Sequence, residues 1–225
     1  MISDLSLEKT LPIVWNDEAS FAAKFIAFNP VFWNIAAQLE LRVKLFTKLG
    51  LGNRYYGCYI LAAIIFSLGI YRDWIYRIAL ESQPVAPLLD NIYAKVGGAA
   101  MFGVGNVLVL SSMWALGITG TYLGDYFGIL MDERIASFPF NVCNNPMYIG
   151  CYLSFLGVSL WYGKALGFVL STLMWVMYMV ALRFEEPYTE RIYSDREKAR
   201  EAAAESSGSS TGTSRPSTRS RTKRV

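Results

Sequence analysis

The chain of 225 residues contains no histidine and only three cysteines. Without histidine, neither a histidine-containing metal site nor a Ser-His or Cys-His catalytic pair can form. Cys58 and Cys151 lie in apolar runs, where a cysteine is most often a small buried side chain, and no spacing of cysteines fits a zinc motif. We therefore expect no metal, and any proton acceptor must be an Asp, Glu, Tyr or Lys side chain or water.

Charged residues are also scarce over long parts of the sequence. The N-terminal stretch is acidic and does not resemble a cleaved secretory signal. Hydrophobic residues make up 53% of the chain, and residues 55–71, 96–124, 135–163 and 165–182 carry no charge. Runs of about 20 apolar residues cross a bilayer as a helix and are rare in soluble cores. We expect an all-α integral membrane protein, a compact bundle of about four to five membrane helices. The net charge of +3 is small, and we expect no nucleic-acid partner.

The apolar segments suggest how the chain crosses the membrane. The first covers residues 20–39 and contains Pro30, which removes a backbone donor, so it either spans with a kink or is re-entrant. Further segments cover residues 55–76, 91–116 and 146–183. The last is interrupted at residues 162–164, which favours two short spans in a helical hairpin over one very long helix.

The predicted hairpin would place Asn145–Tyr148 and Phe184–Glu186 on the same side of the membrane. Lysine and arginine are enriched on the cytosolic side of membrane proteins. This rule places the C-terminus and the basic linker 42–54 in the cytosol. Five crossings satisfy both placements, and a re-entrant first segment would leave three or four.

Polar segments flank the predicted membrane part. We expect an N-terminal segment over residues 1–19, a membrane-embedded domain over 20–197 and a polar, basic low-complexity tail over 198–225. Residues 206–225 have too little apolar surface to fold, so we expect disorder there. The basic residues of the tail suit an anionic lipid surface, although a solvated tail without a role explains the composition at least as well.

Gly103, Val104 and Gly105 form a GxG motif inside the third apolar segment. A Rossmann dinucleotide site is excluded, because no alternation of strands and helices surrounds the motif. Small residues that let two membrane helices approach closely would explain it without a ligand. The neighbouring Asn106 is polar at membrane depth, which adds weight to a ligand-binding role.

Two adjacent carboxylates, Glu185 and Glu186, end the apolar run that begins at Ala165. Acidic side chains at the C-terminal end of a helix are unfavourable, because the helix dipole is negative there. A cationic ligand would compensate for them, and so would pairing with Arg183 or Lys198.

The start of the predicted hairpin holds a second candidate group. Asn145 as a helix cap and Pro146 at the first helical position explain each other without any ligand. This ordinary helix start leaves Tyr148 free to line a binding site.

Together, these pieces resemble the phospholipid N-methyltransferase family, especially its fungal phosphatidyl-N-methylethanolamine branch. The resemblance covers about Asn29 to Tyr193 and rests on AKVGGAAMFGVGNVLVLSSMWALGITGTYLGDYFGIL, FPFNVCNNPMY and ALRFEEPYTERIY. It implies that S-adenosylmethionine is the methyl donor and a lipid amine in the bilayer the acceptor. It also implies residence in the endoplasmic reticulum or the mitochondria-associated membrane. The residues implied to bind the donor are Gly103, Val104, Gly105, Glu185 and Glu186.

The implied chemistry is an in-line displacement by a neutral amine. A free alkylammonium has a pKa of about 10, by analogy with lysine, so it must lose a proton before it attacks. We expect Glu186 to be the catalytic base and Tyr148 to be the second catalytic residue. Cation–π contact with Tyr126 and polar contact with Asn145 would hold the substrate.

Two alternatives remain open at this stage. Isoprenylcysteine carboxyl methyltransferases share a Pro-x-x-Tyr turn and a later Glu-Glu pair, but a histidine precedes their turn. Asn145 stands there in this chain and fits a lipid amine better than a carboxylate. The other alternative is a non-catalytic membrane scaffold or small transporter, in which the GxG motif serves packing alone. The sequence leaves the oligomeric state open.

Overall fold

The computed structural model describes residues 10–132 and 135–209. Their regular structure is entirely helical, which confirms the predicted all-α class. The helices are α2 (Asp17–Val43), α3 (Leu45–Leu49), α4 (Arg54–Glu81), α5 (Ile92–Thr121), the 3-10 helix η1 (Gly124–Phe127), α6 (Pro146–Tyr162) and α7 (Leu166–Ser209). Helix α7 includes the first residues of the predicted disordered tail, and residues 210–225 lie outside the described part.

Asparagine side chains start three of the long helices. The Oδ1 atoms of Asn16, Asn53 and Asn91 accept hydrogen bonds of 2.9 Å from backbone N–H groups in the first turns of α2, α4 and α5. Each bond satisfies a donor that the helix itself leaves without a partner.

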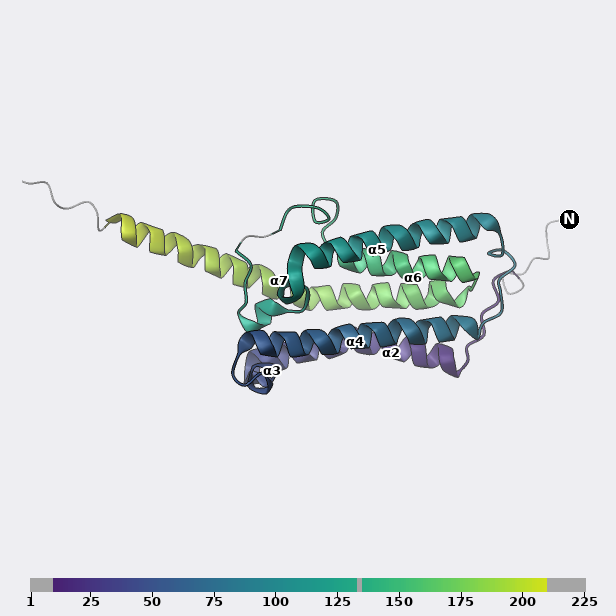
Figure 1. Ribbon diagram of the computed structural model, residues 1–225, viewed down its shortest axis with the longest axis horizontal. Helices are drawn as coiled ribbons and strands as arrows, with labels where there is room; N and C mark the ends of the chain where they lie inside the picture. Colours follow the sequence, from purple (N-terminus) through teal and green to yellow (C-terminus); the bar gives the residue numbers. More distant parts are fainter. Residues whose placement is uncertain (1–9, 133–134, 210–225) are drawn as a thin grey trace, which may run out of the picture. The chain divides into compact units, whose positions relative to one another are not determined.

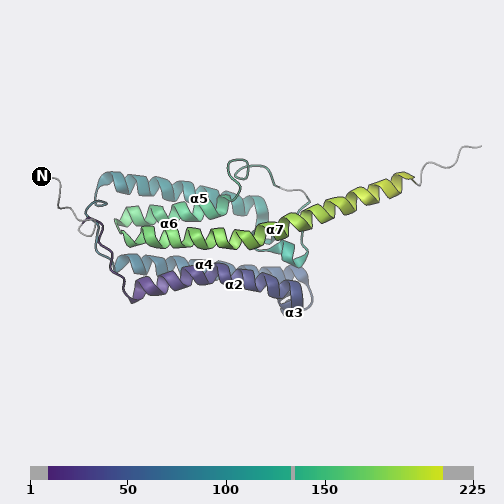
Figure 2. The ribbon, with the colours of Figure 1, turned by 180° about the vertical axis from the view of Figure 1, so that it is seen from behind.

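The first apolar segment is one continuous helix. Helix α2 runs for 27 residues and lies beside α4, as Figures 1 and 2 show. The first apolar segment is therefore not a re-entrant turn. Pro30 lies inside α2, and its carbonyl accepts a 3.0 Å hydrogen bond from Nδ2 of Asn34. The helix therefore continues through the proline and carries residues 31–43 toward α7.

Three helices in the described part are long and apolar enough to cross a membrane. These candidate spans are Arg54–Glu81, Ile92–Phe127 and Leu166–Ala203. Large apolar side chains cover their outer surfaces; Trp114 is 91% exposed and Leu110 62% exposed. Such a surface suits lipid rather than water, and the chain is an integral membrane protein.

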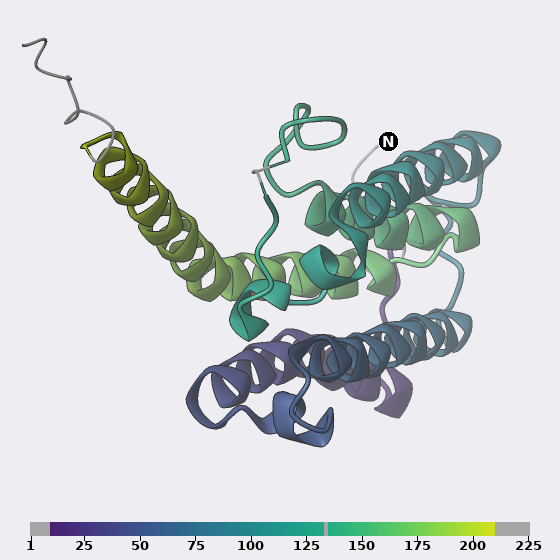
Figure 3. The ribbon, with the colours of Figure 1, turned by 60° about the vertical axis from the view of Figure 1, so that its left-hand side comes forward.

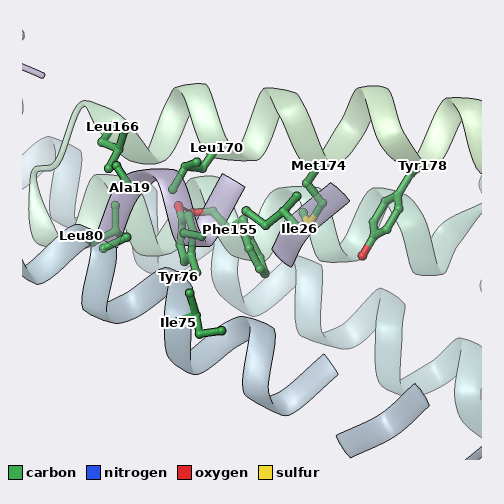
Figure 4. Close-up of a cluster of buried hydrophobic side chains, with 12 residues drawn as sticks. Ala19, Ile26, Ile75, Tyr76, Leu80, Phe155, Leu166, Leu170, Met174 and Tyr178 are labelled. Atoms are coloured by element: carbon green, nitrogen blue, oxygen red, sulfur yellow. Dashed lines mark hydrogen bonds between the residues drawn. The ribbon is translucent and has the colours of Figure 1, made fainter. Parts of the chain in front are cut away.

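A buried core joins four helices (Figure 4). Its members include Ala19 and Ile26 of α2, Tyr76 of α4, Phe155 of α6 and Leu170 of α7. The ring centroids of Tyr76 and Phe155 are 4.2 Å apart, and the Tyr76 hydroxyl donates to the Phe155 carbonyl at 2.9 Å. Since the core includes the starts of both α2 and α7, these two helices run in the same direction.

Helices α5 and α6 approach closely through glycines, and Figure 3 shows them side by side. A Cβ atom added to Gly105 would lie 2.5 Å from the Gly150 carbonyl oxygen, and one added to Gly98 would lie 2.6 Å from that of Gly157. Close glycine contacts of this kind are a common way for membrane helices to pack.

The predicted hairpin is confirmed. Helix α6 ends at Tyr162, Gly163 takes a left-handed conformation with a φ of 64°, and α7 begins at Leu166. The turn is held at this end of the bundle by a 2.8 Å hydrogen bond from the Ala86 N–H to the Gly163 carbonyl. The start of α6 consequently lies next to residues 184–186.

A buried glutamate organises the turn between α2 and α3. Glu40 is 0% exposed, and its Oε2 accepts hydrogen bonds from the N–H groups of Phe46 at 2.8 Å and Thr47 at 3.1 Å. Phe46 packs in a small core with Cys58 of α4 and Phe127 of η1. The predicted basic linker is therefore a folded cap on the same end of the bundle as η1.

The chain divides into two compact units, Met1–Glu186 and Pro187–Val225. The second unit, described as far as Ser209, is helical and charged, with an exposed Arg191–Asp195 pair at 3.8 Å. The predicted limits of the membrane-embedded domain, residues 20–197, stay a prediction.

Candidate active site

Glu185 lies where α7 meets α2 and α6, and its carboxylate accepts three hydrogen bonds. Trp33 Nε1 donates to Oε1 at 2.6 Å, and Asn34 Nδ2 donates to the same oxygen at 3.2 Å. The Tyr148 hydroxyl donates to Oε2 at 2.7 Å. A carboxylate offers about four acceptor positions, so Glu185 is held in place and still has room for one more donor.

Aromatic rings pack beside this carboxylate. The Tyr178 ring lies 4.7 Å from that of Tyr148 in an edge-to-face arrangement and 6.0 Å from that of Trp33. We call Trp33, Tyr148 and Tyr178 the aromatic group. Aromatic faces next to a carboxylate are a favourable environment for an alkylammonium ion, because both attract positive charge.

A buried arginine is hydrogen-bonded to one member of the aromatic group. Arg72 of α4 is 8% exposed, and its Nη1 donates a 2.6 Å hydrogen bond to the Tyr178 hydroxyl. Its guanidinium also pairs with Asp73 at 2.8 Å and lies over the Phe155 ring at 5.0 Å. Charged groups within membrane helices are costly and usually serve function, and here the charge fixes the position of Tyr178.

Glu186 has a different environment from its neighbour. Its side chain is exposed, and its Oε1 accepts a 3.0 Å hydrogen bond from Nδ2 of Asn145. Asn145 is the N-cap residue of α6, but its side chain makes no capping hydrogen bond and reaches across the hairpin instead. The hairpin therefore brings together two of the predicted groups, Asn145–Tyr148 and Glu185–Glu186.

The GxG motif lies across α6 from these carboxylates. Gly105 packs against Gly150 of α6, which is two residues from Tyr148 and so on nearly the opposite face of that helix. Gly103 and Val104 are exposed, and a Cβ atom added to Gly103 would meet nothing within 4 Å. Helix packing explains Gly105, whereas the surface at Gly103 is open to a ligand.

Tyr126, the predicted substrate contact in η1, is 1% exposed. Its backbone N–H donates to Oδ1 of Asp125 at 3.1 Å, and the following Phe127 belongs to the small core beneath α2 and α4. Its role in substrate binding stays a prediction.

Four residues of the site were missed by the sequence analysis: Trp33, Asn34, Arg72 and Tyr178. Asn34 and Arg72 are polar residues within apolar segments, and this signal could have identified them. Nothing local distinguished Trp33 or Tyr178 from the other aromatic residues of the membrane helices, because their roles depend on contacts between helices.

Comparisons of the sequence with known proteins show its family. A family model described as phospholipid methyltransferase matches residues 93–196. The phosphatidyl-N-methylethanolamine N-methyltransferase of Saccharomyces cerevisiae is 58% identical over 173 residues, which cover 77% of this chain and 84% of the relative. The Emericella nidulans protein of the same name is 55% identical and covers 82% and 89%. Human phosphatidylethanolamine N-methyltransferase is 42% identical and covers 81% and 91%.

No solved structure matches the chain significantly. The relatives nevertheless cover most of the membrane part in which the hairpin, the carboxylate pair and the GxG motif lie. The resemblance seen in the sequence is thereby confirmed, and the chain belongs to the phospholipid methyltransferase family.

Proposed function

We propose that this enzyme methylates the amine of phosphatidyl-N-methylethanolamine and then of the dimethylated lipid, which yields phosphatidylcholine. The methyl donor is S-adenosylmethionine. The observation that carries the proposal is the adjacent pair Glu185 and Glu186, which meets Tyr148 and Asn145 across the hairpin. The names of the fungal relatives support the choice of acceptor.

The residues present fit the chemistry of the donor. The exposed carboxylate of Glu186 accepts one hydrogen bond from Asn145 and keeps acceptor positions for an amino group or ribose hydroxyls. The open surface at Gly103 lets a flat ligand approach the backbone. When bound, the donor supplies an electrophilic methyl group on a sulfonium. We propose that Glu186 and Glu185 bind it on one side of the start of α6 and that Gly103 and Val104 bind it on the other, so that the donor extends around this end of the helix, with Gly105 setting the position of α5.

The two carboxylates have different roles in this proposal. Glu185 faces the aromatic group and attracts the lipid ammonium, whereas Glu186 faces Asn145, binds the donor and borders the amine as the proposed base. As the nitrogen gains methyl groups, it loses hydrogen-bond donors, and cation–π contact with Trp33, Tyr148 and Tyr178 increasingly holds it. One site can therefore accept both lipids.

The chain must also take up a proton, since only a neutral amine attacks. The ammonium has a pKa of about 10 in water; burial lowers this pKa, whereas the Glu185 carboxylate and the aromatic rings raise it, so a base is required. Glu186 remains the proposed base, and the Tyr148 hydroxyl, which is hydrogen-bonded to Glu185, is the second catalytic group. The remaining contribution is positioning, because a methyl group moves only when nitrogen, carbon and sulfur are aligned.

We also propose a location for the enzyme. The basic linker 42–54 forms the same end of the bundle as the site, so the site opens to the cytosol by the positive-inside rule. The membrane is that of the endoplasmic reticulum, including mitochondria-associated regions. The basic tail over residues 198–225 contacts anionic lipid there.

The test is an acceptor panel with labelled S-adenosylmethionine and membranes that contain the full chain. We expect label in monomethyl and dimethyl lipid, and none in a prenylated cysteine. Membranes without the chain set the background. Failure of correctly inserted protein to label either lipid would refute the proposed function.

A further inference from the structure

A surface groove of about 630 Å³ lies between α2 and α7. Its apolar walls include Val31, Ile35 and Leu39 of α2 and Val180 and Phe184 of α7. All five side chains are more than a third exposed. We call this feature the α2–α7 groove.

The α2 wall of the groove has an apolar stripe and, beside it, a polar stripe. Val31, Ile35 and Leu39 are spaced four residues apart and form one stripe, while Asn34, Gln38 and Arg42 form a second stripe beside it. A ligand that lies in this groove therefore meets hydrocarbon along one side and polar groups along the other. An amphiphile has this character, whereas a fully polar ligand does not.

The polar stripe leads to the candidate active site. Asn34 lines the groove, and its Nδ2 also donates to Oε1 of Glu185 at 3.2 Å. Phe184, in the opposite wall, is the direct neighbour of Glu185. The groove and the carboxylate therefore share a border, and a ligand in the groove reaches the site without leaving the protein surface.

The far end of the polar stripe carries a positive charge. Arg42 is exposed, and in the described part of the chain no carboxylate lies within ion-pair distance of it. Side chains in a helix lean toward its N-terminus, so the guanidinium leans toward Gln38 and Asn34. A guanidinium binds phosphate well, because its N–H groups match two phosphate oxygens.

We propose that the α2–α7 groove is the binding site of the glycerophospholipid acceptor. An acyl chain lies along the apolar stripe, Arg42 binds the phosphate, and the amine points past Asn34 to Glu185 and the aromatic group. This inference rests on the proposed function, since it assigns a place to the lipid of that reaction. Charge explains the orientation: the anionic phosphate lies at the arginine and the cationic amine at the carboxylate.

The test measures kcat and the KM values for lipid and donor in detergent micelles, with two monomethyl lipids. One has long acyl chains, and the other has six-carbon chains and is water-soluble. In Arg42→Gln we expect the KM for both lipids to rise about tenfold, since a charge-assisted hydrogen bond is lost. In Ile35→Trp, which fills the groove, we expect the KM to rise for the long-chain lipid and to stay within about twofold for the short-chain one. The donor KM and kcat should not change.

Two control variants make the same kinds of substitution outside the groove. Lys48→Gln removes an exposed charge on α3, and Leu110→Trp enlarges an exposed residue of α5. Val180→Trp fills the groove from α7 and repeats the Ile35→Trp test if that variant does not fold.

The outcomes separate the two proposals. If the wild-type enzyme labels lipid but the groove variants behave like their controls, the groove proposal is wrong and the proposed function stands. A rise in the donor KM instead of the lipid KM would assign the groove to the donor and also overturn the proposal. If the wild-type enzyme labels no lipid, both proposals fail together.

Discussion

The Tyr148 hydroxyl donates a 2.7 Å hydrogen bond to Oε2 of Glu185, across 37 residues of sequence. This bond joins the start of α6 to the end of the apolar part of α7. It places an aromatic ring and a carboxylate side by side, and both attract an alkylammonium ion.

We predict that Tyr148→Phe keeps the fold and lowers kcat/KM by about 10- to 100-fold, because a hydrogen bond to a charged group contributes about 1.5–3 kcal/mol. The ring and its contact with Tyr178 remain, so the loss isolates the hydroxyl. Steady-state kinetics with the monomethyl lipid measure it. Tyr152→Phe, in a ring packed against Trp175 at 5.1 Å, is the control and should retain activity. Equal activity of both variants would remove the hydroxyl from the mechanism.

The two glutamates should respond differently to truncation. Glu185→Ala leaves the donors on Trp33, Asn34 and Tyr148 without their acceptor, and each such loss costs about 1–3 kcal/mol when the donor is buried. Glu186→Ala releases only the half-buried Asn145, whose hydrogen bond to Glu186 is exposed. We expect thermal unfolding to shift strongly for Glu185→Ala and little for Glu186→Ala.

Donor binding completes this comparison. Glu186→Ala should lose most of the stabilisation that S-adenosylmethionine gives to the wild-type protein, since a ligand stabilises the state it binds. Full donor stabilisation of Glu186→Ala would show that the donor is held elsewhere. Glu18→Ala, at an exposed position early in α2, serves as the control for the loss of a carboxylate.

Substitutions at the two glycines of the GxG motif should have different effects. Gly103→Leu meets open space, so we expect its unfolding temperature to stay at or above that of the wild type, while donor affinity falls at least tenfold. Gly105→Ala pushes a methyl group against the backbone of α6, and we expect it to destabilise the fold. Thermal unfolding and donor titration of both variants provide the measurement. An unchanged donor affinity in Gly103→Leu would argue against a donor at this surface.

Labelling of single cysteines should confirm the hairpin in the membrane. The starts of α4 and α6 lie at one end of the bundle and the loop between α4 and α5 at the other (Figure 1). In a background without the native cysteines, Asn53→Cys and Asn145→Cys should react with an impermeant reagent from the cytosolic side. Leu88→Cys, in the loop between α4 and α5, should react from the opposite side. Opposite labelling of positions 53 and 145 would contradict the bundle.

Much of the fold could be predicted from contiguous sequence. Uncharged runs indicated the membrane helices, and the interruption at residues 162–164 indicated the hairpin that Gly163 makes. The course of the first segment could not be decided, because a proline permits either a kinked span or a re-entrant turn. In the structure α2 is continuous and packs on both sides of Pro30, with Ile26 in the core around Tyr76 and Ala36 in the core with Phe46.

The candidate site was predicted in part. The carboxylate pair and the Asn145–Tyr148 group could be recognised as motifs, and the hairpin implied that they meet. The partners from α2 and α4 could not be recognised from the sequence, since Trp33 is 152 residues from Glu185 and Arg72 is 106 residues from Tyr178. Hydropathy identifies a membrane helix but does not specify which of its faces meets another helix.

The sequence by itself determined the class of the protein, its membrane helices and the family motifs, because these depend on composition and on neighbouring residues. Only the tertiary structure decided that Glu185 and Glu186 have different partners, that Gly105 packs while Gly103 is open, and that α2 and α7 border a groove. These features depend on the rotation of each helix about its axis. That rotation is set by side-chain packing among helices distant in sequence, chiefly the glycine contacts of α5 with α6 and the buried core around Tyr76.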